Sequence, residues 1–166
     1  FDGDDFPPAG WTVNHLAGAA AVGWRAGNVE DHNFSEINPE NAYSAICGYD
    51  ENNNQIERLL SPAFDIAGSM PTLTFWAGYN SYWTTNYEVK VYITKSASAD
   101  PDVVIWQQKV DGNDGTEGWE WRECAVDLGP YAGRQNVHLC WEYNGRDGDL
   151  FALDDIWIYT DATAVE

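Results

Sequence analysis

The chain has 166 residues, 44% of them hydrophobic, which is enough for one compact domain with a substantial core. A membrane span is excluded because no run approaches the ~18 consecutive apolar residues that a transmembrane helix needs. The 27 acidic residues outnumber the 8 basic ones, and this net charge of -19 excludes a nucleic-acid partner. The acid excess leaves three interpretations, which are a solvated acidic surface, salt adaptation, or carboxylates that surround a calcium ion.

Taken in chain order, the predicted elements are nearly all strands. Residues 16–25 come closest to a helix, but Gly18 and Gly23 interrupt the pattern and predict a loop or a single turn. Later runs are rich in β-branched and aromatic residues and alternate in polarity, as in Val89, Val91 and Ile93. The predicted strands span residues 73–77, 87–94, 103–110, 124–128, 137–143 and 150–159.

Short strands separated by long polar loops predict an all-β fold, a two-sheet antiparallel β-sandwich of jelly-roll type. We expect a single binding module over residues 1–160 and the start of a linker at residues 161–166. Because the chain begins at Phe1, without an initiator Met, we also expect it to be a module of a larger precursor.

The last predicted strand carries two adjacent acids. Strict alternation would place Asp154 on the face of Ile156, and Asp155 on the face of Trp157 and Tyr159. Either way, at least one carboxylate lies among apolar neighbours and needs compensation, from a cation or from backbone amides or an Arg.

The cysteines Cys47, Cys124 and Cys140 show no metal-ligand spacing with the histidines, so zinc is not expected. Two alternatives stand for them. One is a disulfide between Cys124 and Cys140, and the other is three buried thiols.

Catalytic motifs are missing from the sequence. It contains no Gly-x-Ser-x-Gly turn, no His-Glu-x-x-His and no Gly-rich phosphate loop. No predicted strand places paired carboxylates on one face, as glycoside hydrolysis would require. The prediction is a non-catalytic protein.

Calcium is the cofactor that the acids favour. The run 2–5 holds three aspartates near one end of the chain, and Asp154 and Asp155 lie near the other end. First and last strands are often neighbours in a sandwich, so these oxygen ligands could meet around one ion.

Aromatic residues near loops indicate where a ligand would bind. Tyr79, Tyr82 and Trp83 occur among Asn, Ser and Thr, a composition that suits sugar because a ring stacks on the apolar face of a pyranose while amides and hydroxyls bind its hydroxyl groups. Trp119 and Trp121, two residues apart, could form a flat platform. The alternative for each pair is packing between the sheets.

Several short motifs keep one order along the whole chain. They are Phe6-Pro7-Pro8-Ala9-Gly10-Trp11, Leu59-Leu60-Ser61-Pro62, Leu73-Thr74-Phe75-Trp76, Val126-Asp127-Leu128-Gly129-Pro130-Tyr131-Ala132-Gly133 and Ala152-Leu153-Asp154-Asp155-Ile156. Together they resemble the cleaved-adhesin domains, also called choice-of-anchor or MAM-like jelly rolls. The resemblance implies a secreted bacterial, non-catalytic module that is attached to adhesins, proteases or glycosidases.

The chain is also similar to calcium-bearing carbohydrate-binding jelly rolls. That similarity implies a structural calcium ion shared by Asp2 and Asp154, with Glu40 or Asn41 as the third ligand. The segment 14–21 departs from the family because it lacks the usual acids, and we expect it to pack or to contact a partner instead of binding a second calcium.

Two functions follow as hypotheses. The first is a secreted or cell-surface accessory module, covalently part of a larger chain, that binds a polysaccharide or glycan through exposed aromatic residues. The second is a protein-binding adhesin or spacer domain, in which the same aromatic residues contact a protein surface.

Overall fold

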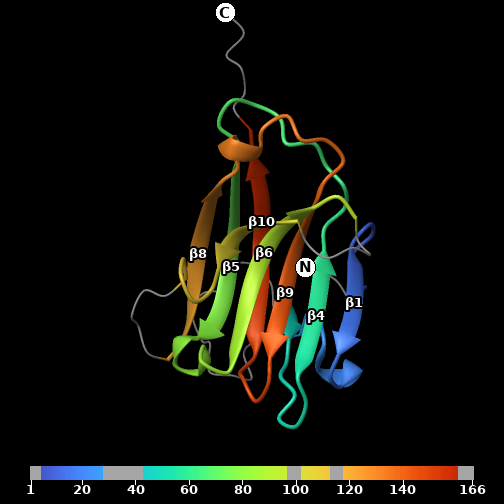
Figure 1. Cartoon of the computed structure of the whole chain (residues 1–166), viewed down its shortest axis with the longest axis vertical. Coiled ribbons are helices and arrows are strands. Elements are labelled where there is room, and N and C mark those ends of the chain that lie inside the picture. The colour runs from blue at the N-terminus through green and yellow to red at the C-terminus, as the bar shows by residue number, and fades with distance from the viewer. Residues whose placement is uncertain (1–4, 28–42, 97–101, 113–117, 161–166) are drawn as a thin grey trace, which may run out of the picture.

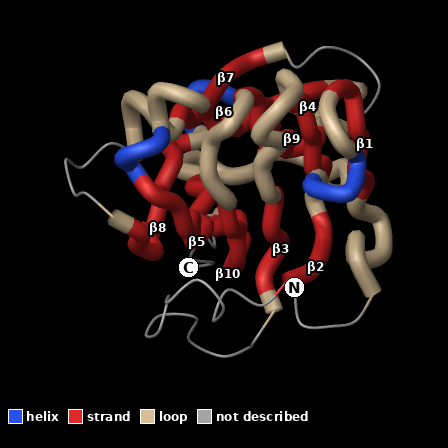
Figure 2. Tube along the Cα trace, turned by 90° about the horizontal axis from the view of Figure 1, so that it is seen from below, coloured by secondary structure: helices blue, strands red, loops and turns tan. Residues whose placement is uncertain are grey.

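A computed structural model describes residues 5–27, 43–96, 102–112 and 118–160, and two stacked β-sheets dominate it (Figure 1). Within these residues, ten strands form two antiparallel sheets of five strands each. Seen from below, the sheets lie one above the other as two layers (Figure 2). This confirms the predicted all-β sandwich of jelly-roll type.

Sheet A is the layer with the strand order β1-β4-β9-β6-β7. Its strands are β1 (Thr12–Ala17), β4 (Gln55–Leu60), β9 (His138–Gly145), β6 (Tyr87–Thr94) and β7 (Val103–Gln107). Sheet B has the order β2-β3-β10-β5-β8. Its strands are β2 (Arg25–Gly27), β3 (Ser44–Cys47), β10 (Phe151–Tyr159), β5 (Thr72–Asn80) and β8 (Trp119–Asp127). In the described part of the chain, three single-turn 3-10 helices connect strands, η1 (Ala20–Val22), η3 (Ser81–Trp83) and η4 (Gly129–Tyr131).

The core lies between the sheets, and alternation along the strands fills it. Val89, Val91 and Ile93 of β6 are fully buried, as their spacing predicts. Phe75 of β5 reaches across and meets two tryptophans edge-on, Trp106 at 5.4 Å and Trp141 at 5.9 Å between ring centroids. These contacts join the two layers into one body.

The last strand contains a β-bulge. Asp154 pairs with Trp76 of β5, but the next partners are Trp157 and Thr74, so β10 holds one extra residue there. Asp155 adopts a left-handed φ of 48°, a conformation that Asp tolerates better than most residues. The bulge overturns strict alternation in this strand. Trp157 shares the outer face with Asp154, instead of sharing a face with Asp155.

The predicted strand over 103–110 is shorter than expected. The amides of Val110 and Asp111 donate to the carbonyl of Gln107, at 3.1 and 2.8 Å, and the chain turns. Residues 16–25 contain the single turn η1, as predicted. Among the described residues, no helix is long and apolar enough to cross a membrane.

All three cysteines are buried free thiols, which decides between the two alternatives. Cys124 lies on β8 of sheet B and Cys140 on β9 of sheet A, so the two belong to different layers. Burial raises the pKa of each of these two thiols to about 12, and it also raises the pKa of Cys47.

Candidate carbohydrate-binding surface

Two of the predicted ligand-binding residues form an exposed aromatic pair at one end of the sandwich. Tyr82 and Trp83 are 65% and 38% exposed, and their rings meet edge to face at 5.1 Å. They belong to η3, which Asn80 caps by accepting a hydrogen bond from the Tyr82 amide at 3.1 Å. Thr84 donates its hydroxyl hydrogen to the carbonyl of Ser81 at 2.9 Å. The local hydrogen bonds therefore fix the backbone beneath two rings that face solvent.

Polar groups surround this pair. The amide N–H of Asn86 donates to the Trp83 carbonyl at 2.9 Å, and its side-chain amide donates to the Asp147 carbonyl at 2.7 Å. The hydroxyl of Thr85 donates to Asn86 Oδ1 at 3.1 Å and is exposed. Two connections, β5 to β6 and β9 to β10, thus meet here. They bring amides and hydroxyls beside exposed rings, which is the composition predicted for a sugar site.

Tyr79 is a correction to the predicted set. It is fully buried, and its ring stacks on Phe151 at 5.7 Å with an interplanar angle of 8°. The Arg122 guanidinium lies over the Tyr79 ring, 4.5 Å from its centroid. The Tyr79 hydroxyl donates a hydrogen bond to the Gly112 carbonyl. The β5 alternation turns Tyr79 into the core, where no ligand can reach it.

Trp121 is the second correction. It lies opposite Gly78, where a Cβ would meet the indole ring at 3.1 Å, so the ring covers the glycine backbone closely. It packs with Ile46, Leu150 and Ala152, and only 7% of it is exposed. Trp119 packs partly buried against the same cluster. The two tryptophans do share a face, but they form no open platform.

The outer face of β10 carries two aromatic residues that the sequence interpretation did not assign to a ligand. Trp157 and Tyr159 are 60% and 57% exposed, because the bulge at Asp155 places them outside. The Asp-Asp doublet in the middle of an apolar strand was the available signal, since Asp is favoured where a strand must take a positive φ.

Only one of the three predicted calcium ligands lies among the described residues. Asp2 and Glu40 fall outside them. Asp154 is 5% exposed, its Oδ1 accepts the Asp155 amide at 3.0 Å, and its Oδ2 accepts the Ser44 hydroxyl at 3.1 Å. Among the described residues no group of three His, Cys, Asp or Glu side chains is close enough to hold a metal. The Asp154 carboxylate is the one predicted ligand that the described residues contain, and carboxylate oxygens are the ligand type that calcium prefers.

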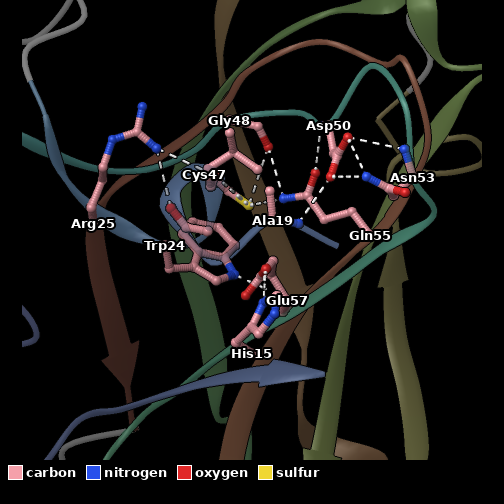
Figure 3. A network of polar contacts seen from close by, with 12 residues as sticks. His15, Ala19, Trp24, Arg25, Cys47, Gly48, Asp50, Asn53, Gln55 and Glu57 are labelled. Carbon is pink, nitrogen blue, oxygen red and sulfur yellow. Dashed lines mark hydrogen bonds and ion pairs between the residues drawn. The ribbon is translucent and has the colours of Figure 1, made fainter. Parts of the chain in front are cut away.

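A polar network fixes the segment that precedes β2 (Figure 3). Asp50 accepts the amides of Asn52, Asn53 and Ala19, each at 2.9 Å. These hydrogen bonds, with Asn52 the largest, lower the pKa of Asp50. The acid-free segment 14–21 therefore packs on the β3–β4 loop, one of the two outcomes expected for it.

Glu57 lies beside these contacts and has two of its own, to His15 and to Trp24 Nε1 (Figure 3). Its side chain is fully buried, and His15 Nδ1 lies 2.5 Å from its Oε1. Burial raises the pKa of Glu57, and the hydrogen bond to His15 opposes that shift. The second carboxylate oxygen has no hydrogen-bond partner. The pair joins β1 to β4. It is therefore separate from the aromatic pair on η3.

Comparison of sequences and structures places the fold among known proteins. No model of a protein family matches the sequence, and no curated protein does. Two cleaved adhesin domains of Lys-gingipain from Porphyromonas gingivalis match in structure, with TM-scores of 0.67 and 0.64. Their sequence identities are 17% and 16%, and the match covers 93% of each chain.

The carbohydrate-binding module TmCBM61, solved in complex with β-1,4-galactotriose, matches with a TM-score of 0.58. It is 14% identical, and the match covers 95% of this chain and 91% of that one. The fold is therefore the one that the motifs predicted, shared by cleaved adhesin domains and a carbohydrate-binding module.

Proposed function

We propose that the chain is a non-catalytic carbohydrate-binding module and that Tyr82 and Trp83 form its ligand contact. The observation that carries the proposal is this exposed pair on a capped turn, with hydroxyl and amide groups beside it. The similarity to a module solved with a galactotriose supports a sugar ligand. The similarity to cleaved adhesin domains supports a place outside the cell, as part of a larger chain.

Binding would combine stacking with hydrogen bonds. A ring of the Tyr82–Trp83 pair covers the C–H face of a pyranose, and Thr85 and Asn86 lie close enough along the chain to bond its hydroxyl groups. The turn is already fixed by its cap, so little conformational entropy is lost when sugar binds.

Affinity electrophoresis in gels that contain soluble β-1,4-galactan, xylan or galactomannan tests the proposal. We expect at least one polysaccharide to retard the protein, and the variant Tyr82→Ala/Trp83→Ala to lose most of that retardation. Leu16→Ala is the matched control, because Leu16 is 52% exposed and lies on β1, an edge strand that β4 and β9 separate from β6. Retardation that is the same in the double variant and the wild type would assign the sugar contact elsewhere.

The proposal includes a structural calcium ion. Asp154 would be one ligand, and Asp2 and Glu40 are the other candidates. Support comes from the position of the buried Asp154 carboxylate on β10, between β3 and β5, because carboxylate oxygens are the ligands that calcium prefers. The ion would hold the last strand to earlier parts of the chain.

A protein-binding adhesin or spacer domain is the second candidate function. The observation in its favour is the match to two adhesin domains over nearly the whole chain. The two candidates differ in one result of the electrophoresis. A domain that binds only protein migrates equally in all gels, with or without polysaccharide.

A further inference from the structure

We propose that the module carries a second glycan-binding surface, on the outer face of sheet B, formed by Trp157 and Tyr159 and the hollow beside them. This inference rests on the proposed function, because it assumes that the ligand is a glycan. It concerns residues far from Tyr82 and Trp83, and it gives the module two separate contacts with polysaccharide.

The bulge in β10 creates this surface. After Asp155, Trp157 pairs with Thr74 and Tyr159 with Thr72 of β5. Residues that pair directly across an antiparallel sheet point to the same side, so both rings share a face with the two threonine hydroxyls. Ile156 and Ile158 pack instead against the core. Because strand residues two apart are separated by about 7 Å, the rings form a short row on the sheet.

A hollow of about 660 Å³ adjoins the Tyr159 end of this row. Met70, Thr72, Asp127, Pro130 and Tyr159 are among the residues that line it. Met70 is 68% exposed, which adds apolar surface beside the tyrosine ring. Asp127 uses Oδ1 to accept the Gly129 amide at 2.7 Å, and its other oxygen accepts no hydrogen bond from a described residue. The hollow thus offers an apolar wall together with an acceptor for hydroxyl groups.

This mixture of groups identifies a neutral polysaccharide as the ligand. Stacking rings, two threonine hydroxyls and a carboxylate match the apolar faces and hydroxyl groups of linked pyranoses. The centre of a protein interface would be depleted of an exposed carboxylate such as Asp127. A polyanionic glycan is disfavoured by the net charge of -19.

The two surfaces lie at opposite ends of one strand. Tyr159 pairs with Thr72 at the start of β5, whereas Asn80 at its end caps the turn of Tyr82 and Trp83. In Figure 1, β5 runs along the long axis of the sandwich. Eight residue steps along a strand span about 26 Å, so one sugar cannot occupy both surfaces. A long chain, or two chains, could contact both, which would raise the apparent affinity without any new contact.

The test uses affinity electrophoresis with the same neutral polysaccharides and four proteins, the wild type, Tyr82→Ala/Trp83→Ala, Trp157→Ala/Tyr159→Ala and the combination of all four substitutions. We expect each double variant to weaken retardation at least threefold and the combined variant to migrate freely. Leu16→Ala again serves as the control. Thermal unfolding of each variant checks that it is folded, and Trp157→Gln/Tyr159→Gln replaces the alanine pair if that pair does not fold.

The outcomes separate the two proposals. Retardation of Trp157→Ala/Tyr159→Ala that equals the wild type overturns the second surface and leaves the proposed function standing if Tyr82→Ala/Trp83→Ala loses retardation. The opposite pattern supports the surface on β10 and removes the one on η3. If no neutral polysaccharide retards the wild type, both proposals fail. If the β10 substitutions change only self-association measured by light scattering, the face is an interface between copies, and the inference is overturned.

Discussion

Glu57 shows how one residue can make the stability of this fold depend on pH. Its carboxyl group is buried on the core side of sheet A, and only His15 pairs with it among the described residues. Because burial raises its pKa, the folded protein holds this proton to a higher pH than the unfolded chain does. The free energy of unfolding therefore falls as the pH rises from about 4.3, the ordinary Glu value, through the raised pKa of the folded state.

Glu57→Gln removes this ionisation. We expect the melting temperature of the variant to increase relative to that of the wild type as the pH rises from 4 to 8, because glutamine has no charge to bury. Circular dichroism melts at several pH values measure the difference. Glu123→Gln, on the exposed side of β8, is the control and should show no such trend. Parallel curves for Glu57→Gln and the wild type would contradict the explanation.

The sequence alone does not show which of two similar aromatic residues is buried and which is exposed. Tyr79 and Tyr82 occur three residues apart among the same polar neighbours, yet one is fully buried and the other is 65% exposed. What decides between them is where β5 ends and η3 begins, and that depends on the pairing of β5 with β8 and β10. Composition identified the aromatic end of the molecule, but it could not assign each ring to the core or to solvent.

At the scale of elements, strands with regular alternation were predicted well. The prediction for 87–94 matches β6, and that for 150–159 differs from β10 by one residue. The bulge inside β10 was missed because a period-two pattern has no place for an extra residue. That single residue decides that Trp157 and Tyr159 lie outside the core.

The bulge makes a prediction about Asp155. Its φ of 48° favours glycine over a β-branched residue. We expect Asp155→Gly to be more stable than Asp155→Val by about 1–2 kcal/mol. Both variants lose the same carboxylate, so their difference in urea unfolding isolates the backbone conformation. Equal stabilities would mean that the bulge relaxes to an ordinary strand conformation when Asp155 is replaced.

Cross-strand register also places a buried ion pair on the outer face of sheet A. Arg58 of β4 lies opposite Glu142 of β9, with Nε to Oε2 at 2.6 Å, and Tyr92 of β6 donates its hydroxyl to Glu142 Oε1 at 3.3 Å. Both charged side chains are about nine-tenths buried. The pair joins three neighbouring strands near the middle of the sheet.

Replacing one member of this ion pair should lower the free energy of unfolding more than replacing both members. We expect Arg58→Met alone to lower the free energy of unfolding by about 3 kcal/mol, because it leaves the Glu142 charge buried without its partner. The double variant Arg58→Met/Glu142→Leu should recover much of that loss. A double-mutant cycle by urea denaturation measures the coupling, and additive single effects would show that the two charges act independently.

At the scale of the whole molecule, the charge and the proposed calcium ion are connected. The net charge of -19 makes the compact state repel itself, and any bound cation reduces that repulsion.

The motifs predicted the overall fold because turn and strand signals recur along the chain. The positions of the acids near the two ends of the sequence suggested a calcium ion, but the choice of Asp2, Glu40 and Asp154 as its ligands came from the family resemblance, because the three lie in distant parts of the sequence.

Chelation tests the calcium proposal. We expect the melting temperature to fall when EDTA removes calcium, and to rise again when calcium is added in excess. At 100 times the dissociation constant, binding would add about 2.7 kcal/mol to the stability. Asp154→Asn should lose this response, whereas Asp127→Asn, an exposed control on β8, should keep it. Equal melting temperatures with EDTA and with calcium would remove the ion from the proposal.

The three buried thiols allow the opening of the sandwich to be timed strand by strand. With pKa values near 12, Cys124 and Cys140 hold almost no reactive thiolate at neutral pH while the protein is closed. We expect a thiol reagent to label each cysteine only when its own strand opens. Mass spectrometry of labelled peptides would then report separate rates for β3, β8 and β9. A single shared rate would mean that the two sheets separate in one event. A faster rate at Cys47 would show that the sandwich opens first at β3, beside β2.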